Sequence, residues 1–270
     1  MDNRAVGVFD SGLGGLTAVR VLKKLIPEEK IIFLGDTERM PYGSRDTETL
    51  KRYADDDFRF LLSKNVKYIL VACGTISSNL KRFSLDHIPV PVTGVIEPTA
   101  DAAFKASYNR RIGVIATEAC IRSGAYQASL AGLDPSVSVT AVPCPKLVPL
   151  IEAFSPERYR DELFDTVSEY LEPIKKDCCD TLILGCTHYP LISDVISECL
   201  GDNVVLIDSG AEAAAYAVRD ISRRSLNTCL RSEQDLELYV TADPDRFTNS
   251  ASFFLGEAAN KAQLVNLQKS

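Results

Sequence analysis

Tyr68-Ile-Leu-Val-Ala-Cys73-Gly-Thr75 and Thr181-Leu-Ile-Leu-Gly-Cys186-Thr-His188 are the two stretches that decide the fold of this chain. Each is a short, continuously apolar run that delivers a cysteine to its end. Such runs are typical of strands buried on both faces of a parallel sheet. The repetition indicates that two halves of one chain present two thiols in the same way.

Strand-like and helix-like segments alternate along the whole chain. The expected strands are 6–9, 31–34, 68–72 and 92–95, followed by 112–116, 137–141, 182–184 and 204–207. Helices are expected between them, among others after Gly15 and at about 46–64 and 75–83. Continuously apolar strands that alternate with helices predict an α/β fold with parallel sheets covered on both faces.

The second half of the chain resembles a repeat of the first. Val6-Gly-Val-Phe-Asp10-Ser11 aligns with Ile112-Gly-Val-Ile-Ala-Thr117, at an offset close to the one that separates Cys73 from Cys186. In open α/β sheets, ligands bind at the carboxyl ends of the strands. Two facing lobes would therefore bring Asp10, Thr117 and both cysteines around one cleft.

Composition narrows the possible functions. With 270 residues, of which 46% are hydrophobic, the chain can bury the core of two compact lobes. The net charge of −7 and the lack of a Lys/Arg-rich block argue against a nucleic-acid partner. The sequence has no apolar run long enough to cross a membrane, and Met1 lies close to the first strand. We therefore expect a cytoplasmic protein without membrane contact.

Cysteine and histidine usage argues against a metal site. The chain has eight cysteines, which we expect to be reduced, only two histidines, His87 and His188, and no C-x-x-C motif. His87 is interpreted as a surface residue, and Asp55-Asp56-Asp57 as a solvent-exposed helix face. The cysteines expected to serve only as small hydrophobic residues are Cys178, Cys179, Cys199 and Cys229.

Two turns follow the first strands. Asp10-Ser-Gly-Leu-Gly-Gly15 differs from G-x-G-x-x-G and lacks the Gly-Lys-Ser/Thr of a P-loop, so nucleotide binding is not expected. It predicts a tight strand-to-helix turn whose amides could hold a carboxylate. Pro41-Tyr42-Gly43-Ser44 predicts a second turn, which offers more backbone donors if it lies near the cleft.

Two thiols across a cleft, without a cofactor motif, suit a two-base racemisation. One thiolate removes a proton from a carbon, and the other thiol supplies a proton to the opposite face. Each cysteine lies where a strand passes into a helix, and a helix N-terminus favours the thiolate. Asp10 could act near Cys73 and His188 near Cys186. The alternatives are that Asp10 and His188 only cap helices, and that the cysteines are ordinary core residues.

The chain resembles the glutamate racemases from end to end. The motifs that carry the resemblance are Val-Phe-Asp10-Ser-Gly-x-Gly-Gly, Pro41-Tyr-Gly43, Cys73-x-Thr75, Val95-Ile-Glu97-Pro, Ala116-Thr117, Cys144-Pro-x-Leu-Val-Pro-Leu-Ile-Glu152, Gly185-Cys-Thr-His-Tyr-Pro-Leu191, Leu206-Ile-Asp208-Ser, Tyr239-Val-Thr-Ala-Asp-Pro-x-x-Phe247 and Phe254-Leu-Gly256. The resemblance implies a cofactor-independent enzyme, a homodimer, that interconverts L- and D-glutamate and supplies D-glutamate for peptidoglycan.

The resemblance also implies an architecture and a set of site residues. Two pseudo-symmetric, flavodoxin-like domains, 1–97 plus 209–270 and 98–208, would hold the substrate in the cleft between them. The implied catalytic residues are Cys73, Cys186, Asp10, His188 and Glu152. The implied substrate contacts are Ser11, Pro41, Tyr42, Gly43, Ser44, Gly74, Thr75, Thr117 and Thr187.

Two positions depart from the family pattern. The family usually reads Cys-Asn-Thr where this chain has Cys73-Gly74-Thr75, and commonly has Thr where this chain has Cys120. Losing one hydrogen bond to a charged substrate would weaken binding by about 1.5–3 kcal/mol, unless water or Cys120 fills the gap. Three alternatives stay open: a racemase of altered specificity, a one-thiol decarboxylase of the same superfamily, and a degraded amino-acid-binding protein.

Overall fold

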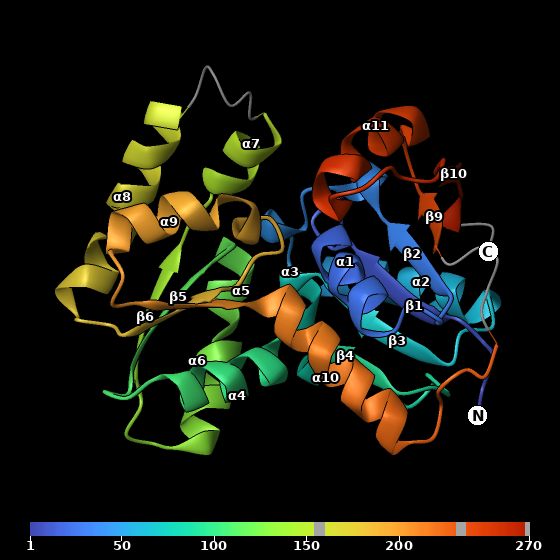
Figure 1. Cartoon of the computed structure of the whole chain (residues 1–270), viewed down its shortest axis with the longest axis horizontal. Helices are drawn as coiled ribbons and strands as arrows, with labels where there is room; N and C mark the ends of the chain where they lie inside the picture. The colour runs from blue at the N-terminus through green and yellow to red at the C-terminus, as the bar shows by residue number, and fades with distance from the viewer. Residues whose placement is uncertain (154–159, 231–235, 268–270) are drawn as a thin grey trace.

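The chain folds into two parallel β-sheets flanked by helices (Figure 1). A computed structural model describes residues 1–153, 160–230 and 236–267. The first sheet has the order β10-β9-β2-β1-β3-β4 and the second the order β6-β5-β7-β8. The first sheet contains β1 (Val6–Asp10), β2 (Ile31–Gly35), β3 (Tyr68–Val71), β4 (Val92–Gly94), β9 (Leu236–Val240) and β10 (Gln263–Leu264). The second contains β5 (Arg111–Ala116), β6 (Ser138–Pro143), β7 (Thr181–Leu184) and β8 (Val205–Asp208).

The two sheets repeat one topology. The order β2-β1-β3-β4 matches β6-β5-β7-β8, so β1 corresponds to β5 and β3 to β7. All of these strands pair in parallel. β1, β3 and β7 are buried along their whole length, as their continuously apolar sequences predict. The expected α/β fold with two parallel sheets is confirmed. β9 and β10, which extend the first sheet, were not among the expected strands.

Helices cover both sheets. They are α1 (Leu16–Leu25), α2 (Thr47–Ser63), α3 (Gly74–Ser77), α4 (Ile96–Ala106), α5 (Glu118–Ser123), α6 (Ala125–Leu133), α7 (Leu147–Glu152), α8 (Arg160–Lys176), α9 (Ser193–Leu200), α10 (Ser209–Arg223) and α11 (Pro244–Leu255). The apolar stripe expected on α1 was Leu16, Val19, Leu22, Leu25 and Ile26. The first three are buried and Ile26 is half-buried, but Leu25, at the end of the helix, is exposed. No helix among the described residues is long and apolar enough to cross a membrane.

The helix expected over 75–83 is wrong. The chain forms one turn of α3 and then a separate 3₁₀ turn at Leu80–Arg82. Ser78 Oγ and Asn79 Nδ2 both donate to the carbonyl of Thr75, at 2.9 and 3.0 Å. Polar side chains that bond to nearby backbone groups compete with a continuous helix. The short α3 therefore ends just before Ser78 and Asn79.

One buried cluster spans both sheets, and each lobe also has a buried cluster of its own. A single buried cluster includes Val6 and Leu70 from the first sheet and Ile112 and Ile183 from the second. α4 and α10 pack against each other between the sheets, as Figure 1 shows. The predicted domain boundary at 97/98 falls inside α4, and the boundary at 208/209 at the start of α10. The domain limits themselves stay a prediction.

Candidate active site

One cavity of about 400 Å³ lies between the two lobes, at the carboxyl ends of the central strands. Every site residue expected from the sequence lines it: Asp10, Ser11, Pro41, Tyr42, Gly43, Ser44, Cys73, Gly74, Thr75, Thr117, Glu152, Cys186, Thr187 and His188. The lining residues that were not among the expected site residues are Met40, Glu118, Cys144, Pro145, Val148, Pro149 and Gly185. The fold thus brings the expected residues together, and their individual roles stay predictions.

The first thiol lies beside a carboxylate. Cys73 follows β3 and is only 4% exposed, and its Sγ lies 3.8 Å from Ser11 Oγ. Asp10, at the end of β1, accepts hydrogen bonds from the amides of Ser11 and Gly15 at 2.8 and 2.6 Å. Burial, and then the negative charge of Asp10, raise the pKa of the Cys73 thiol well above its usual value. The one-turn helix α3 does not outweigh these two effects.

Asp10 is itself a perturbed acid. Burial raises the pKa of the Asp10 carboxyl, whereas the charge of His188 and the amides of Ser11 and Gly15 oppose this rise. Its bond to Gly15 lies in the turn before α1, whose N-cap is Gly15 itself and has no side-chain capping hydrogen bond, so the capping interpretation of Asp10 is wrong. A carboxyl with a raised pKa beside a buried thiol is suited to exchange a proton near that thiol.

The second thiol lies beside a cation. His188 Nδ1 lies 3.8 Å from Cys186 Sγ, and Nε2 lies 3.0 Å from Glu152 Oε1. Burial lowers the pKa of His188, but its hydrogen bonds with Cys186 and Glu152 outweigh burial and raise the pKa to about 10. At neutral pH His188 is therefore an imidazolium that can donate a hydrogen bond to Cys186. Its side chain makes no capping hydrogen bond, so the capping interpretation of His188 is wrong.

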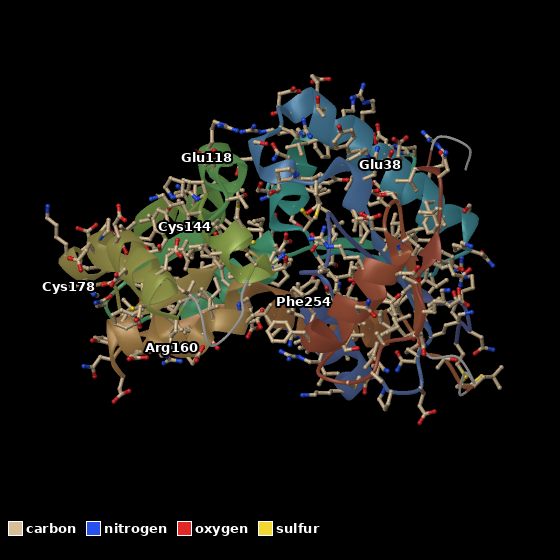
Figure 2. The ribbon with its side chains drawn as sticks, turned by 90° about the horizontal axis from the view of Figure 1, so that it is seen from above. Glu38, Glu118, Cys144, Arg160, Cys178 and Phe254 are labelled. Carbon is tan, nitrogen blue, oxygen red and sulfur yellow. The ribbon has the colours of Figure 1, made fainter. Side chains whose placement is uncertain are left out.

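The histidine is held from the other lobe as well. The ring of Phe254, on α11, contacts the His188 ring edge to face at 5.7 Å. Figure 2 shows Phe254 on the first lobe, with Cys144 on the second. Thr187 Oγ1 donates to Asp10 Oδ2 at 3.3 Å, also across the lobes. The turn that carries His188 is thus joined to Asp10 across the cleft.

Hydroxyl groups supply part of the polar lining of the cavity, beside the carboxyls of Asp10, Glu118 and Glu152. Thr75 Oγ1 and Thr117 Oγ1, from opposite lobes, lie 3.1 Å apart. Among the described lining residues there is no Lys or Arg. Anionic groups of a substrate would therefore be bound by hydroxyls, backbone amides and the His188 imidazolium.

The loop that carries Pro41 to Ser44 rests on buried acidic residues. The Tyr42 hydroxyl donates to Asp36 and, at 3.2 Å, to Asp57 Oδ2, while Arg39 pairs with Asp36 and with Asp57. Burial, together with the charge of Asp36, raises the pKa of Asp57 well above its usual value. The same burial raises the pKa of Tyr42.

The interpretation of the triple aspartate as a solvent-exposed helix face is wrong at Asp57. This residue is fully buried, because it lies on the same side of α2 as Leu50, Ala54, Phe58 and Leu61. That spacing was a sequence signal for burial. His87, in contrast, is exposed as expected, and its Nε2 lies 3.8 Å from Asp55.

The other cysteines lie in different surroundings. Cys120 is buried in α5 outside the cavity, so it does not fill the space beside Gly74; burial raises its pKa to about 12. Cys144 lines the cavity, and the sequence had indicated it only as part of a motif. The cysteines expected to be inert lie outside the cavity: Cys178 and Cys229 are exposed, Cys199 is half-buried and Cys179 is buried.

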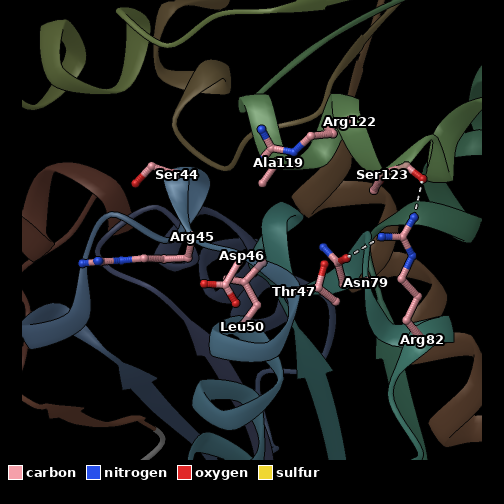
Figure 3. Close-up of a pocket in the computed structure, with 10 residues that line it drawn as sticks. All are labelled: Ser44, Arg45, Asp46, Thr47, Leu50, Asn79, Arg82, Ala119, Arg122 and Ser123. Carbon is pink, nitrogen blue, oxygen red and sulfur yellow. Dashed lines mark hydrogen bonds between the residues drawn. The ribbon is translucent and has the colours of Figure 1, made fainter.

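A second, smaller cavity of about 320 Å³ lies where α2, α3 and α5 meet (Figure 3). It shares Ser44 with the first cavity. Arg82 of the first lobe donates to the carbonyl of Ser123 in the second lobe at 3.1 Å and to Asn79 Oδ1 at 3.5 Å. Figure 3 shows the Arg82 guanidinium between these two partners. The contact fastens the lobes together beside the cleft.

Comparison with known proteins places this architecture in a family. Residues 17–217 match the family described as Asp/Glu/Hydantoin racemase. The chain is 41% identical over 262 residues to a glutamate racemase of Desulforudis audaxviator, with 95% of each chain covered. It is 40% identical over 269 residues to one of Lactiplantibacillus plantarum, covering 98% of this chain and 97% of the relative.

Solved structures agree with the sequence comparison. A glutamate racemase of Bacillus anthracis superposes with a TM-score of 0.91 at 32% identity, with 99% of each chain covered. A glutamate racemase of Francisella tularensis, solved in complex with D-glutamate, superposes with a TM-score of 0.89 at 32% identity over 100% of each chain. The chain therefore belongs to the Asp/Glu/Hydantoin racemase family and, within it, to the glutamate racemases.

Proposed function

We propose that the protein interconverts L-glutamate and D-glutamate by proton transfer at Cα between Cys73 and Cys186. The observation that carries this proposal is that the two thiols, one from each lobe, line a single cavity together with Asp10 and His188. Membership of the glutamate racemases supports the same isomerase activity. The retention of both cysteines and both neighbouring acid/base groups argues against a one-thiol decarboxylase and against a degraded binding protein.

The reaction would proceed in two balanced proton transfers. The thiolate on one side of the substrate takes the Cα proton and becomes a thiol, and the electron pair of the C–H bond stays on the substrate as a carbanion. The thiol on the opposite side then gives its proton to Cα and becomes a thiolate. The stereocentre is inverted and the two cysteines have exchanged protonation states. The roles are reversed for the other enantiomer.

The neighbouring groups would set which thiol is charged at the start of each turnover. Burial and Asp10 raise the pKa of Cys73, so Cys73 rests as a thiol able to donate. The His188 imidazolium lies 3.8 Å from Cys186 Sγ, where it can stabilise a developing charge on that sulfur. Glu152 would hold the imidazole ring in place through its bond to Nε2.

Glutamate is the substrate that the relatives support. A structural relative at 32% identity is solved with D-glutamate. The hydroxyl-lined cavity between the lobes is of a size for a small amino acid. We infer that the product D-glutamate serves peptidoglycan synthesis, as in the family. We also infer a homodimer, which sedimentation equilibrium would test.

Incubation of the pure protein with L-glutamate in deuterium oxide tests the proposal. We expect optical activity to decay to zero, with one deuterium incorporated at Cα of each enantiomer formed. Chiral chromatography and mass spectrometry measure both results. Parallel incubation with L-aspartate tests a different specificity. Binding of L-glutamate without exchange at Cα would overturn the proposed reaction. Faster turnover of aspartate than of glutamate would overturn the assignment of glutamate as the substrate.

A further inference from the structure

We propose that Gly74 is a positioning residue that sets the spacing between the two catalytic thiols. Gly74 directly follows Cys73, and Gly185 directly precedes Cys186. The two glycines lie against each other across the cleft, and we refer to them as the glycine contact. The inference rests on the proposed two-thiol reaction, because it assigns a catalytic consequence to this contact.

The glycine contact leaves no room for a side chain at position 74. A Cβ built on Gly74 would lie 2.5 Å from the carbonyl oxygen of Gly185, whereas ordinary contacts of a Cβ begin at 3.4 Å. The obstacle is a backbone atom of the opposite lobe and not the end of a flexible side chain. Any residue other than glycine therefore requires the two backbones to move apart by several tenths of an ångström.

Gly185 cannot move back to make that room. Its amide donates to the carbonyl of Ile115 at 2.8 Å, which fixes it to the end of β5. A Cβ built on Gly185 would lie 2.9 Å from the Ile115 oxygen, 3.0 Å from Ala116 Cβ and 3.1 Å from the ring of Tyr126. The space on the Cβ side of Gly185 is thus already filled by its own lobe.

Gly74 is fixed in a similar way on the first lobe. The carbonyls of Cys73 and Gly74 accept hydrogen bonds from the amides of Ser77 and Ser78 at 2.9 and 3.0 Å. Gly74 and Thr75 are both buried. Because both glycines are held by their own lobes, a side chain at position 74 would separate the lobes. Each catalytic cysteine is the residue next to one of these glycines, so the two thiols would move apart as well.

Hydrogen bonds that join the two lobes near the glycine contact would be lengthened by such a separation. Thr75 and Thr117 lie 3.1 Å apart across the same cleft, and Arg82 reaches the carbonyl of Ser123 at 3.1 Å (Figure 3). The family pattern usually has Asn where this chain has Gly74, and Asn carries a Cβ that this arrangement excludes. The lack of a side chain at position 74 allows Gly74 and the carbonyl of Gly185 to lie in direct contact in this chain.

The experiment compares Gly74→Ala and Gly74→Ser with the control Gly132→Ala. Gly74 is not among the glycines with positive φ, so alanine can adopt its backbone conformation. Gly132 is exposed in α6, with nothing within 4 Å of a Cβ built on it. We expect both Gly74 variants to lower kcat by about 10- to 100-fold, since a misplacement of about 1 Å can cost that much, and KM to change less. The control should keep the kcat of the unchanged protein.

Crystal structures of the same variants separate this inference from the proposed function. We expect the distance between Cys73 Sγ and Cys186 Sγ to be longer by about 0.5 Å or more in both Gly74 variants, which should be less stable than the control but still unfold cooperatively above the assay temperature. An unchanged sulfur-to-sulfur distance, or an unchanged kcat in a protein that racemises glutamate, would overturn the inference. If the unchanged protein does not racemise glutamate, the proposed function fails. The sulfur-to-sulfur distance in the variants then still tests whether Gly74 sets the spacing of the two thiols.

Discussion

The turn after β3 and the turn after β7 have equivalent places in their sheets but opposite electrostatic surroundings. Each delivers a cysteine and a threonine to the cleft, from corresponding strands of the two sheets. The thiol of Cys73 faces the carboxyl of Asp10, whereas that of Cys186 faces the imidazolium of His188. A two-base reaction needs one thiol and one thiolate at any moment. A repeated backbone with unlike neighbours provides this difference without a cofactor motif.

Because the two turns place one thiol on each side of the substrate, we expect the reaction to need both thiols. Cys73→Ser and Cys186→Ser should each lower kcat for racemisation by at least about 10²- to 10⁴-fold, because a hydroxyl is a far weaker proton donor than a thiol and does not lose its proton to become a base at neutral pH. Polarimetry measures the effect in both directions. Cys229→Ser is the matched control, because Cys229 is exposed and lies outside the cavity. Near-normal turnover by either active-site variant would contradict the two-thiol reaction.

The difference between the turns predicts direction-dependent effects. We expect Asp10→Asn and His188→Asn each to lower kcat by about 10- to 100-fold, mainly for one of the two enantiomers as substrate. The enantiomer affected by one variant should be the opposite of the one affected by the other. The ratio kcat/KM must remain equal in the two directions, since the enantiomers have equal free energy. Primary isotope effects with Cα-deuterated L- and D-glutamate should therefore rise for opposite enantiomers in the two variants. Equal isotope effects in both variants would mean that the neighbours do not act on separate thiols.

The sequence predicts well those features that depend on the hydrophobic pattern and on the order of strands along the chain. The apolar runs that end in Cys73 and Cys186 indicated both central strands, and the repeat from Val6 to Ile112 indicated two equivalent sheets. Parallel strands bring their carboxyl ends to one edge, which is why the expected site residues meet in one cavity. These features follow from local pattern plus general rules of sheet topology.

Contacts between distant backbones do not leave such a pattern. Nothing in the sequence near Gly74 shows that the carbonyl of Gly185 fills the place of a side chain. The direction of the pKa shift at Cys73 also depends on how deeply it is buried and on Asp10, more than on the short helix that follows. At Asp57 the pattern was present, since the residue continues the apolar stripe of α2, but its charge favoured the wrong interpretation.

The comparison extends to what supports each side of the cleft. The loop at Tyr42 is held by the buried carboxyls of Asp36 and Asp57. Asp57→Ala should lower the free energy of unfolding by about 1–3 kcal/mol, because it removes one of the two buried carboxyls that bond to Tyr42 and Arg39 and leaves only Asp36 in that role. It should also raise KM for glutamate. Urea unfolding and steady-state kinetics measure the two effects.

Asp55→Ala is the control for that variant. Asp55 lies on the partly exposed side of α2, and its carboxylate lies 3.8 Å from the exposed His87. A change of less than about 0.5 kcal/mol is expected for a surface pair of this kind. Similar stability losses in both variants would show that the buried cluster does not support the loop.

The smallest expected effect concerns the protonation of His188. In a His87→Gln background only one imidazole remains, and its NMR signals should show a charged ring from pH 6 to pH 8, in keeping with a pKa of about 10. Removal of the Glu152 charge in Glu152→Gln should lower this pKa by about one unit or more, since a carboxylate in contact favours the imidazolium. An imidazole that titrates near pH 6.5 in the unchanged protein would contradict the assignment.

The same shift fixes the pH dependence of stability. The pKa of His188 is raised above that of an unfolded histidine, about 6.5, so its interactions stabilise the fold fully below that pH. This stabilisation declines above it and is lost as the pH rises through about 10. Glu152→Gln should therefore be less stable than the unchanged protein at neutral pH, and the difference should vanish above about pH 10. A stability difference that persists above about pH 10 would mean that Glu152 supports the turn after β7 by packing. It would then not act through the charge of His188, which distinguishes this turn from the turn after β3.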